Sequence, residues 1–273
     1  MKKKKIMDEV TELAREAADA TLEIYRENFE VEYKKDERNS PLTEADKTSH
    51  QIITEGLQEI TPEIPVISEE SGANMDYEVR KDFNKFWLVD PLDGTREFVK
   101  KNDEFTVNIG LIENRRPVAG VVVVPTTDVV YKTDGRKALK IDNNIQEIIS
   151  VSNVDEPEEA IATRSRSHSG EQVKKLFDRV NFKDSLPCGS SLKFCRLAEG
   201  IADVYCRFNP TWEWDTAAAH AVLKKAGGKV TEPDGSSLKY NKQSLKNKNG
   251  FLVTNNLLHD SILKQIRSIT KKQ

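Results

Sequence analysis

Three features of the sequence predict a layered α/β fold, in which helices and sheets form alternating layers. Two stretches with apolar residues at helical spacing come first, and a series of β-rich runs follows them. Beyond residue 158, short β-rich runs alternate with helical patterns, which is typical of an α/β unit. The polar segment 133–158, whose periodicity is weak, separates the two patterns. We therefore predict an N-terminal α+β half, residues 1–145, and a C-terminal α/β half, residues 146–273.

The N-terminal half opens with a pair of predicted helices. Apolar residues recur every three or four positions from Ile6 onward, so a first amphipathic helix is expected to end near Tyr33. A polar link, residues 34–41, follows it. A second helix begins around Thr43 and ends at Thr61, because the next residue is a proline. A helix pair followed by an antiparallel sheet is thus expected in this half.

Runs rich in β-branched and aromatic residues predict the strands of both halves. In the N-terminal half they span residues 64–67, 86–89, 105–113, 118–124 and 129–132, the last of them as an edge strand. Residues 114–117 form a hairpin loop between two of these strands. In the C-terminal half strands are predicted at residues 160–164, 184–186, 202–208, 229–230 and 251–254, and helices at residues 171–180, 191–199, 215–226 and 257–269.

The amino-acid composition indicates which kinds of partner the protein binds and in which cellular compartment it is expected. Lys plus Arg number 42 and Asp plus Glu 45, so a net charge of -3 provides no overall attraction for a nucleic-acid polymer or an anionic membrane. No apolar run is long enough for a transmembrane helix, and acidic residues interrupt any signal-peptide core, although peripheral membrane contact stays open. The three cysteines lack CxxC spacing, which argues against a disulfide framework or a zinc site. We expect a cytoplasmic monomer or homodimer in which the cysteines are packing residues.

The turn that follows the predicted strand 86–89 is the most informative segment for function. Asp90 and Asp93 lie at positions i and i+3 in the run Asp90-Pro91-Leu92-Asp93-Gly94-Thr95. This turn offers carboxylates and the Leu92 carbonyl, which suit a divalent cation, beside amides of Gly94 and Thr95, which suit a phosphate. An ordinary surface turn, which Asp, Pro and Gly also favour, is the alternative. The combination suggests metal-assisted phosphoryl chemistry.

Three other acidic positions are candidates for the same site, and each has a structural alternative. Glu69 stands at the end of a predicted strand, where it is either a metal ligand or part of a solvated loop. Asp46 follows Thr43 at the spacing of a capping box, so it either caps the second helix or contacts a metal or its water. Asp215 begins a helix rich in alanine, where it is either an N-cap or a third ligand.

These residues, taken together, resemble the signature of the inositol monophosphatase superfamily of metal-dependent, lithium-sensitive phosphatases. Three motifs carry the resemblance: the run 90–95, Ser68-Glu69-Glu70-Ser71-Gly72, and Trp214-Asp215-Thr216-Ala217-Ala218 ending in Gly227-Gly228. Within the superfamily, the chain is similar to the CysQ-type 3'(2'),5'-bisphosphate nucleotidases in the runs 40–46, 104–109, 165–168, 189–195 and 198–208. The resemblance implies an inositol monophosphatase-like fold of alternating helix and sheet layers.

The resemblance also implies roles for individual residues. Two or three Mg²⁺ ions would be held by Glu69, Asp90, the Leu92 carbonyl, Asp93 and Asp215. Asp46 would lie near a further, weaker metal or its water. Thr95, with Asp46 or Glu69 as acceptor, would orient the attacking water, and the amides of Gly94 and Thr95 would receive phosphate oxygens.

Four positions match residues that contact the nucleotide in the CysQ branch, namely His168, Ser190, Lys193 and Arg207. Their structural alternatives are a structural histidine, a helix cap and two solvated surface charges, although the neighbouring Arg164 and Arg166 favour a phosphate site. Phe208 occupies the position at which inositol monophosphatases carry a carboxylate for sugar hydroxyls, which favours a nucleotide over inositol.

The implied function is a Mg²⁺-dependent phosphatase of sulfur metabolism. It removes the 3'-phosphate of adenosine 3',5'-bisphosphate and yields AMP and phosphate, with 3'-phosphoadenylyl sulfate as a second candidate substrate. An inositol or other sugar monophosphatase with the same metal site is the alternative enzyme. A nucleotide-binding regulatory protein that has lost turnover is the non-enzymatic alternative.

Overall fold

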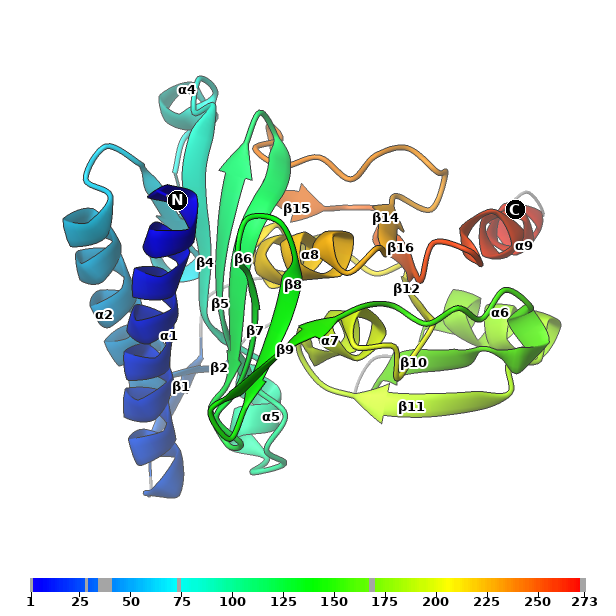
Figure 1. Ribbon diagram of the computed structural model, residues 1–273, viewed down its shortest axis with the longest axis horizontal. Helices are drawn as coiled ribbons and strands as arrows, with labels where there is room; N and C mark the ends of the chain where they lie inside the picture. The colour runs from blue at the N-terminus through cyan, green and yellow to red at the C-terminus, as the bar shows by residue number, and fades with distance from the viewer. Residues whose placement is uncertain (1, 28, 34–40, 73–74, 167–169, 271–273) are drawn as a thin grey trace.

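A computed structural model describes residues 2–27, 29–33, 41–72, 75–166 and 170–270 of the chain. Its elements form five layers, in the order helices, sheet, helices, sheet, helices (Figure 1). The predicted layered α/β fold is therefore confirmed. None of the described helices is both long and apolar enough to cross a membrane.

The outer helical layer consists of α1 (Lys2–Arg26) and α2 (Glu44–Ile60). The second helix has nearly the predicted bounds. The first ends at Arg26, not near Tyr33, because Val31–Tyr33 instead forms strand β1 and pairs with β2, Pro41–Thr43. Most of the predicted polar link, residues 34–40, lies outside the described residues.

The first sheet has seven strands in sequential order, with β3 and β4 parallel and the other pairs antiparallel. Strand β7 was expected at the edge but lies inside the sheet, because the segment 133–158 contributes two strands that its weak periodicity did not predict. The strands are β3 (Val66–Ser68), β4 (Lys85–Asp93), β5 (Thr106–Glu113), β6 (Arg116–Val124), β7 (Val129–Thr133), β8 (Ala138–Asp142) and β9 (Ile145–Ile149).

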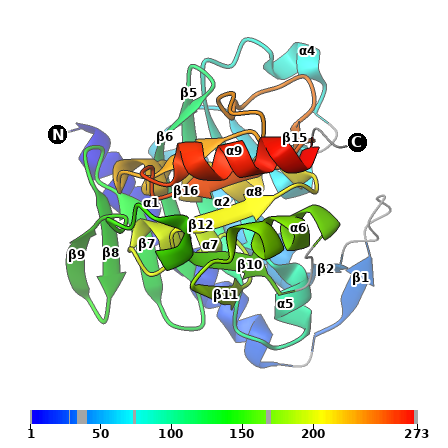
Figure 2. The same ribbon diagram turned by 90° about the vertical axis from the view of Figure 1, so that its right-hand side faces the viewer.

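The second sheet has five strands in the order β11-β10-β12-β16-β14 and belongs to the C-terminal part of the chain. Helices α6 and α9 lie side by side across its outer face (Figure 2). Its strands are β10 (Ile161–Ser165), β11 (Asp184–Cys188), β12 (Val204–Arg207), β14 (Lys229–Thr231) and β16 (Phe251–Thr254), and its outer helices are α6 (Glu171–Val180) and α9 (His259–Thr270).

Helices α7 (Leu192–Ala198) and α8 (Trp214–Lys225) form the layer between the two sheets (Figure 1). Short elements complete the described chain: α3 (Glu69–Gly72), α4 (Tyr77–Arg80), α5 (Thr95–Val99), a 3₁₀ turn (Pro157–Glu159), and a two-stranded ladder of β13 (Thr211–Trp212) and β15 (Lys246–Asn247).

Alternating side chains of the seven-stranded sheet supply two separate cores. On β4, Trp87 and Val89 pack toward α1 and α2, whereas Phe86 and Leu88 pack toward α7 and α8. Side chains on a strand alternate between the two faces, so the next residue on the second face is Asp90. The strand thus delivers a carboxylate at the end of an apolar face.

Helix α8 packs unusually close to this sheet because glycines face it. A Cβ atom added at Gly110 of β5 would lie 2.8 Å from the Ala218 nitrogen, and one added at Gly120 of β6 would lie 2.8 Å from the Ala218 Cα. Neither strand therefore accommodates a side chain where it meets the helix. This close packing determines where the first turn of α8, with Asp215, meets the end of β4.

We predict that Gly120→Ala lowers the free energy of unfolding by about 1–3 kcal/mol, the usual effect of overpacking a core. The added methyl group must displace the backbone of α8. Urea unfolding measures the effect, with Gly170→Ala as the control, because a Cβ there would meet its nearest neighbour at an ordinary 3.8 Å. Equal stability of the two variants would contradict the close packing.

Candidate active site

Helix α2 contacts each segment that carries candidate ligands from the N-terminal half. The Thr95 hydroxyl lies 3.3 Å from Asp46 Oδ1, and Ser49 Oγ donates to the Pro91 carbonyl at 2.8 Å. His50 Nδ1 lies 2.8 Å from the hydroxyl of Ser68, the residue before Glu69. Three positions within two turns of one helix thus fix the turn after β4 and the end of β3.

A bulge in β4 explains how two aspartates three residues apart face the same cavity. Asp90 pairs with Asn108 of β5, and Asp93 pairs with Thr106, so three steps on one strand oppose two on the other. In a regular strand, residues at i and i+3 point to opposite faces. The extra residue restores both aspartates to one side, and Pro91 suits this irregular segment because it has no amide to donate.

The carboxylates of Glu69, Asp90 and Asp215 come together from α3, β4 and α8. One ligand oxygen from each lies within 4.8 Å of the others. Asp215 Oδ2 accepts a hydrogen bond of 3.0 Å from the Trp212 amide, which orients the carboxylate. Three acidic oxygens at this separation are a donor set that fits a hard divalent cation.

This cluster lies in a cavity of about 530 Å³ between the two halves of the chain. The cavity also contains Leu92, Asp93, Gly94 and Thr95 from the β4 turn, and Ser190, Lys193 and Arg207 from the C-terminal half. Its remaining lining residues are Pro41, Arg96, Glu97, Ser165, Ser191, Phe194, Tyr205, Asn209, Pro210, Thr211, Trp212, Thr216, Lys246 and Phe251.

Among the described residues that were predicted for the site, Asp46 is not one of those that line the cavity. Asp46 is buried beneath the cavity and forms the capping box that was one of its two alternatives, while its contact with a metal or water stays a prediction. Its Oδ2 accepts from the Thr43 amide and hydroxyl at 2.7 Å, as in a capping box, while Oδ1 faces Thr95. His168 lies outside the described residues.

Burial and like charge disfavour ionisation in the acidic part of the site. Burial, together with the neighbouring Asp215 carboxylate, raises the pKa of Asp93, and Lys193 opposes the shift. Burial raises the pKa of Asp46 to about 7, and the carboxylates of Glu70 and Glu69 add to the rise. A cation bound in the cluster would lower the pKa of both Asp93 and Asp46.

The cationic part of the cavity comes from α7 and β12. Lys193 Nζ donates to the carbonyls of Ser190 at 2.6 Å and Cys188 at 3.1 Å, which holds the buried ammonium in place. Ser190 has a left-handed backbone with a φ of 41° and stands one residue before the N-cap of α7; its Oγ accepts a long, 3.5 Å hydrogen bond from the amide of Leu192, the first residue of that helix. Ser190 and Lys193 therefore belong to one tightly turned segment.

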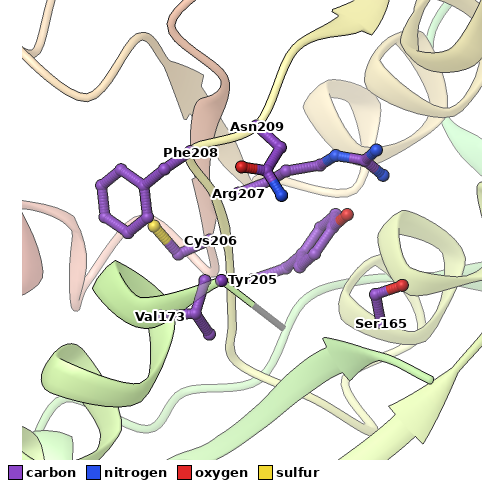
Figure 3. A pocket seen from close by; sticks show the side chains of 8 residues that line it. Ser165, Val173, Tyr205, Cys206, Arg207, Phe208 and Asn209 are labelled. Carbon is purple, nitrogen blue, oxygen red and sulfur yellow. The ribbon is translucent and has the colours of Figure 1, made fainter. Parts of the chain in front are cut away.

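Tyr205 and Arg207 of β12 extend to one side of the strand, whereas Cys206 and Phe208, the residue that follows the strand, extend to the other (Figure 3). Only the first pair lines the large cavity. A small cavity of about 10 Å³, which has room for about one water, adjoins it beside Arg207. Phe208 packs instead against the core of the second sheet, so position 208 presents no group to the large cavity.

Three other observations bear on the sequence predictions. Arg166, expected to support a phosphate site, forms hydrogen bonds of 2.6 and 2.7 Å to the Glu104 carboxylate. The cysteines are free and buried, as expected, and burial raises the pKa of each of the three thiols. Trp212 and Lys246 line the cavity on paired strands but were not predicted as site residues. Lys246 belongs to a lysine-rich segment without a pattern, whereas the position of Trp212 beside the Trp214-Asp215 motif was a usable signal.

The sequence profile of the inositol monophosphatase family matches residues 3–271, nearly the whole chain. The chain belongs to the inositol monophosphatase family. It is therefore a phosphatase of this metal-dependent family, and its acidic cluster could hold a metal ion.

Relatives of this family member include proteins named CysQ. The 3'(2'),5'-bisphosphate nucleotidase CysQ of Salmonella typhimurium is 42% identical over 249 residues, which cover 91% of this chain and 99% of the relative. CysQ from Bacteroides thetaiotaomicron, a crystal structure, matches with a TM-score of 0.79 at 37% identity, over 91% of this chain and 96% of that chain. An IMPase from Thermotoga maritima, at 23% identity and a TM-score of 0.78 over 96% of each chain, shares the fold. The predicted resemblance to the CysQ branch is confirmed.

We predict that Mg²⁺ raises the melting temperature more at pH 8 than at pH 6. A carboxyl whose pKa is raised by folding stabilises the protein fully below its unfolded pKa, near 4, and this contribution is lost as pH rises through about 7 for Asp46. The metal-free protein should therefore melt earlier at pH 8, where fewer protons compete with the cation.

Differential scanning fluorimetry with Mg²⁺ and with EDTA at both pH values measures the difference. Asp93→Asn, which removes one carboxylate from the cavity, should show a smaller Mg²⁺ effect. An equal Mg²⁺ effect at the two pH values would contradict the proposed competition.

Proposed function

We propose that this phosphatase removes the 3'-phosphate of adenosine 3',5'-bisphosphate with the help of bound Mg²⁺, yielding AMP and phosphate. The observation that carries the proposal is a single cavity with a carboxylate cluster in one part and fixed cations, Lys193 and Arg207, in another. A nucleoside bisphosphate has one phosphate to be cleaved and another to be held. 3'-Phosphoadenylyl sulfate, with its 3'-phosphate, is a second candidate substrate.

The residues of the acidic part suit two or three Mg²⁺ ions. Glu69, Asp90, Leu92, Asp93 and Asp215 all line the cavity; their carboxylates and the Leu92 carbonyl would supply oxygen ligands, which Mg²⁺ prefers. When bound, the ions would activate water and stabilise charge on the attacking and leaving oxygens of an in-line displacement.

Thr95 and Asp46 would orient the attacking water. The Thr95 hydroxyl lies 3.3 Å from both Asp46 Oδ1 and the Leu92 carbonyl, and its single proton serves one of them at a time. The hydroxyl oxygen then accepts a hydrogen bond from water in the cavity. Asp46 or Glu69 would receive the proton that the water loses.

The turn at Gly94 would bind the phosphate to be cleaved. Gly94 has a φ of 96° and precedes α5, so its amide and that of Thr95 lie at a helix start, where positive dipole attracts anions. A Cβ at this position would be strained by the positive φ and would lie 3.1 Å from the Glu104 carbonyl. Glycine thus allows the backbone to approach both Glu104 and the phosphate.

The cationic part would hold the other phosphate. Two carbonyls use two of the three Lys193 ammonium protons, and we assign the third to a phosphate oxygen. The planar Arg207 guanidinium suits phosphate through paired hydrogen bonds, and the Ser190 hydroxyl is a further donor. His168, at the matching position of the CysQ branch, is proposed as an additional contact.

An inositol or other sugar monophosphatase would share the acidic part of the site. Its monophosphate substrate, however, would have no second phosphate for Lys193 and Arg207 to bind. Phe208, turned into the core of the second sheet, supplies no acceptor for sugar hydroxyls. Both observations favour the nucleotide.

Phosphate release from adenosine 3',5'-bisphosphate and from inositol 1-phosphate, with Mg²⁺ and then with EDTA, tests this proposal. Two charge-assisted hydrogen bonds, at ~1.5 kcal/mol each, correspond to a kcat/KM about 100-fold higher for the bisphosphate. Chelation should remove both activities, and Asp93→Asn should lose turnover while remaining folded. A preference for inositol 1-phosphate, or turnover in EDTA, would contradict the proposal.

We further predict that Lys193→Met lowers kcat/KM for adenosine 3',5'-bisphosphate by about 10–100-fold, the usual value of a hydrogen bond to a charged group. The same variant should change kcat/KM for 3'-AMP, which has no 5'-phosphate, by much less. Lys264→Met, on the exposed face of α9, is the matched control. An equal loss with both substrates would show that Lys193 does not hold the second phosphate.

A further inference from the structure

Glu213 is a fully buried carboxylate that the proposed chemistry does not use. It stands between Trp212, which lines the cavity, and Trp214, the first residue of α8. Its Oε2 accepts from the Asn241 amide at 2.6 Å, and its Oε1 accepts from the Lys242 amide at 3.1 Å. Lys242 Nζ lies 2.7 Å from the same Oε1 and neutralises the charge. Both partners belong to the loop that precedes β15.

The contacts continue from Lys242 to the metal cluster. Lys242 Nζ also donates to Asn247 Oδ1 at 2.9 Å, and Asn247 Nδ2 donates to the Trp212 carbonyl at 3.1 Å. The Trp212 amide in turn donates to Asp215 Oδ2 at 3.0 Å. The first link is an ion pair, the others are ordinary hydrogen bonds, and most of the atoms are shielded from solvent. A buried charge is thus connected, through three residues, to a carboxylate of the acidic cluster.

Glu213 also holds the start of α8 through its own backbone. Its amide donates to the Leu245 carbonyl at 2.8 Å, and its carbonyl accepts from the Ala217 amide at 3.0 Å and the Thr216 hydroxyl at 3.1 Å. Glu213 therefore joins the segment 240–247 to the first turn of α8 through both its side chain and its backbone. A shift of this loop would move the Trp212 amide and release one oxygen of Asp215.

We propose that Glu213 is a positioning residue for the metal site, which fixes the orientation of Asp215 through Lys242, Asn247 and Trp212. The inference rests on the proposed metal-dependent function and adds a determinant of cation affinity to it. The Trp212 amide engages one Asp215 oxygen and thereby sets the orientation of the carboxylate relative to the cluster. Groups that orient a metal ligand in this way commonly contribute 10–100-fold to metal affinity.

The test is Glu213→Gln. Glutamine keeps the shape of the side chain and one acceptor oxygen, but its NH₂ group would face a backbone amide, and Lys242 would lose its counter-ion. Isothermal titration calorimetry with Mg²⁺ alone measures binding without reference to turnover. We expect an affinity about 10-fold weaker than that of the natural protein.

Glu199→Gln is the matched control. The Glu199 side chain is 5% exposed and pairs with Arg196 at 2.7 Å and Lys140 at 3.0 Å, so its loss removes a similar buried ion pair. These contacts lie on α7 and β8 and do not reach Asp215. Both variants should melt earlier, but only Glu213→Gln should bind Mg²⁺ more weakly. If Glu213→Gln does not fold, Lys242→Met, which keeps the carboxylate and both amide bonds, replaces it and should also weaken Mg²⁺ binding.

The outcomes separate this inference from the proposed function. Unchanged Mg²⁺ affinity in Glu213→Gln, or an equal loss in Glu199→Gln, would overturn the positioning role while metal dependence stands. Absence of Mg²⁺ binding to the natural protein would instead overturn the proposed metal dependence, and with it the inference.

Discussion

The structure holds three carboxylates, from three separate elements, close enough to repel one another strongly. At an effective dielectric of about 20, two unit charges at the 4.8 Å limit of the cluster repel by ~3 kcal/mol. Three such pairs amount to roughly 10 kcal/mol, which is comparable to the whole stability of a typical domain. A cation bound among the three carboxylates would compensate this charge.

The rest of the fold supplies the packing that keeps these carboxylates together. Helix α2 reaches the β4 turn through Asp46 and Ser49, and the bulge in β4 turns both of its aspartates to one side. Glycines at positions 110 and 120 let α8 approach the sheet from the other face. Because each support comes from a different layer, the site depends on the correct stacking of the layers.

Part of this arrangement could be predicted from the sequence, because it depends on local pattern. Helix α6 has the predicted bounds, because its apolar residues recur at helical spacing and the same residues are buried in the structure. Strand β9 escaped prediction because four of its five residues are exposed and show no alternation. Strand β8 lies in the same polar segment and does not alternate between buried and exposed residues either. The first helix was predicted too long, because Val31 and Tyr33 continue its apolar spacing but pair with β2.

In the candidate site, too, some features could be predicted from local sequence pattern and others depend on tertiary contacts. The ligand positions could be recognised because motif spacing and resemblance bear on them directly. The bulge could not, since it depends on which residues of β5 oppose β4. Nor could Glu213, whose burial depends on a loop almost thirty residues further along the chain and which reads in the sequence as an ordinary surface charge.

The most direct test of the account is a crystal structure with adenosine 3',5'-bisphosphate and Ca²⁺, a cation with the same preference for oxygen ligands. The account predicts anomalous peaks among Glu69, Asp90 and Asp215, the 3'-phosphate beside them, and the 5'-phosphate against Lys193 and Arg207. Cations bound elsewhere, or a nucleotide whose 5'-phosphate faces solvent, would contradict it.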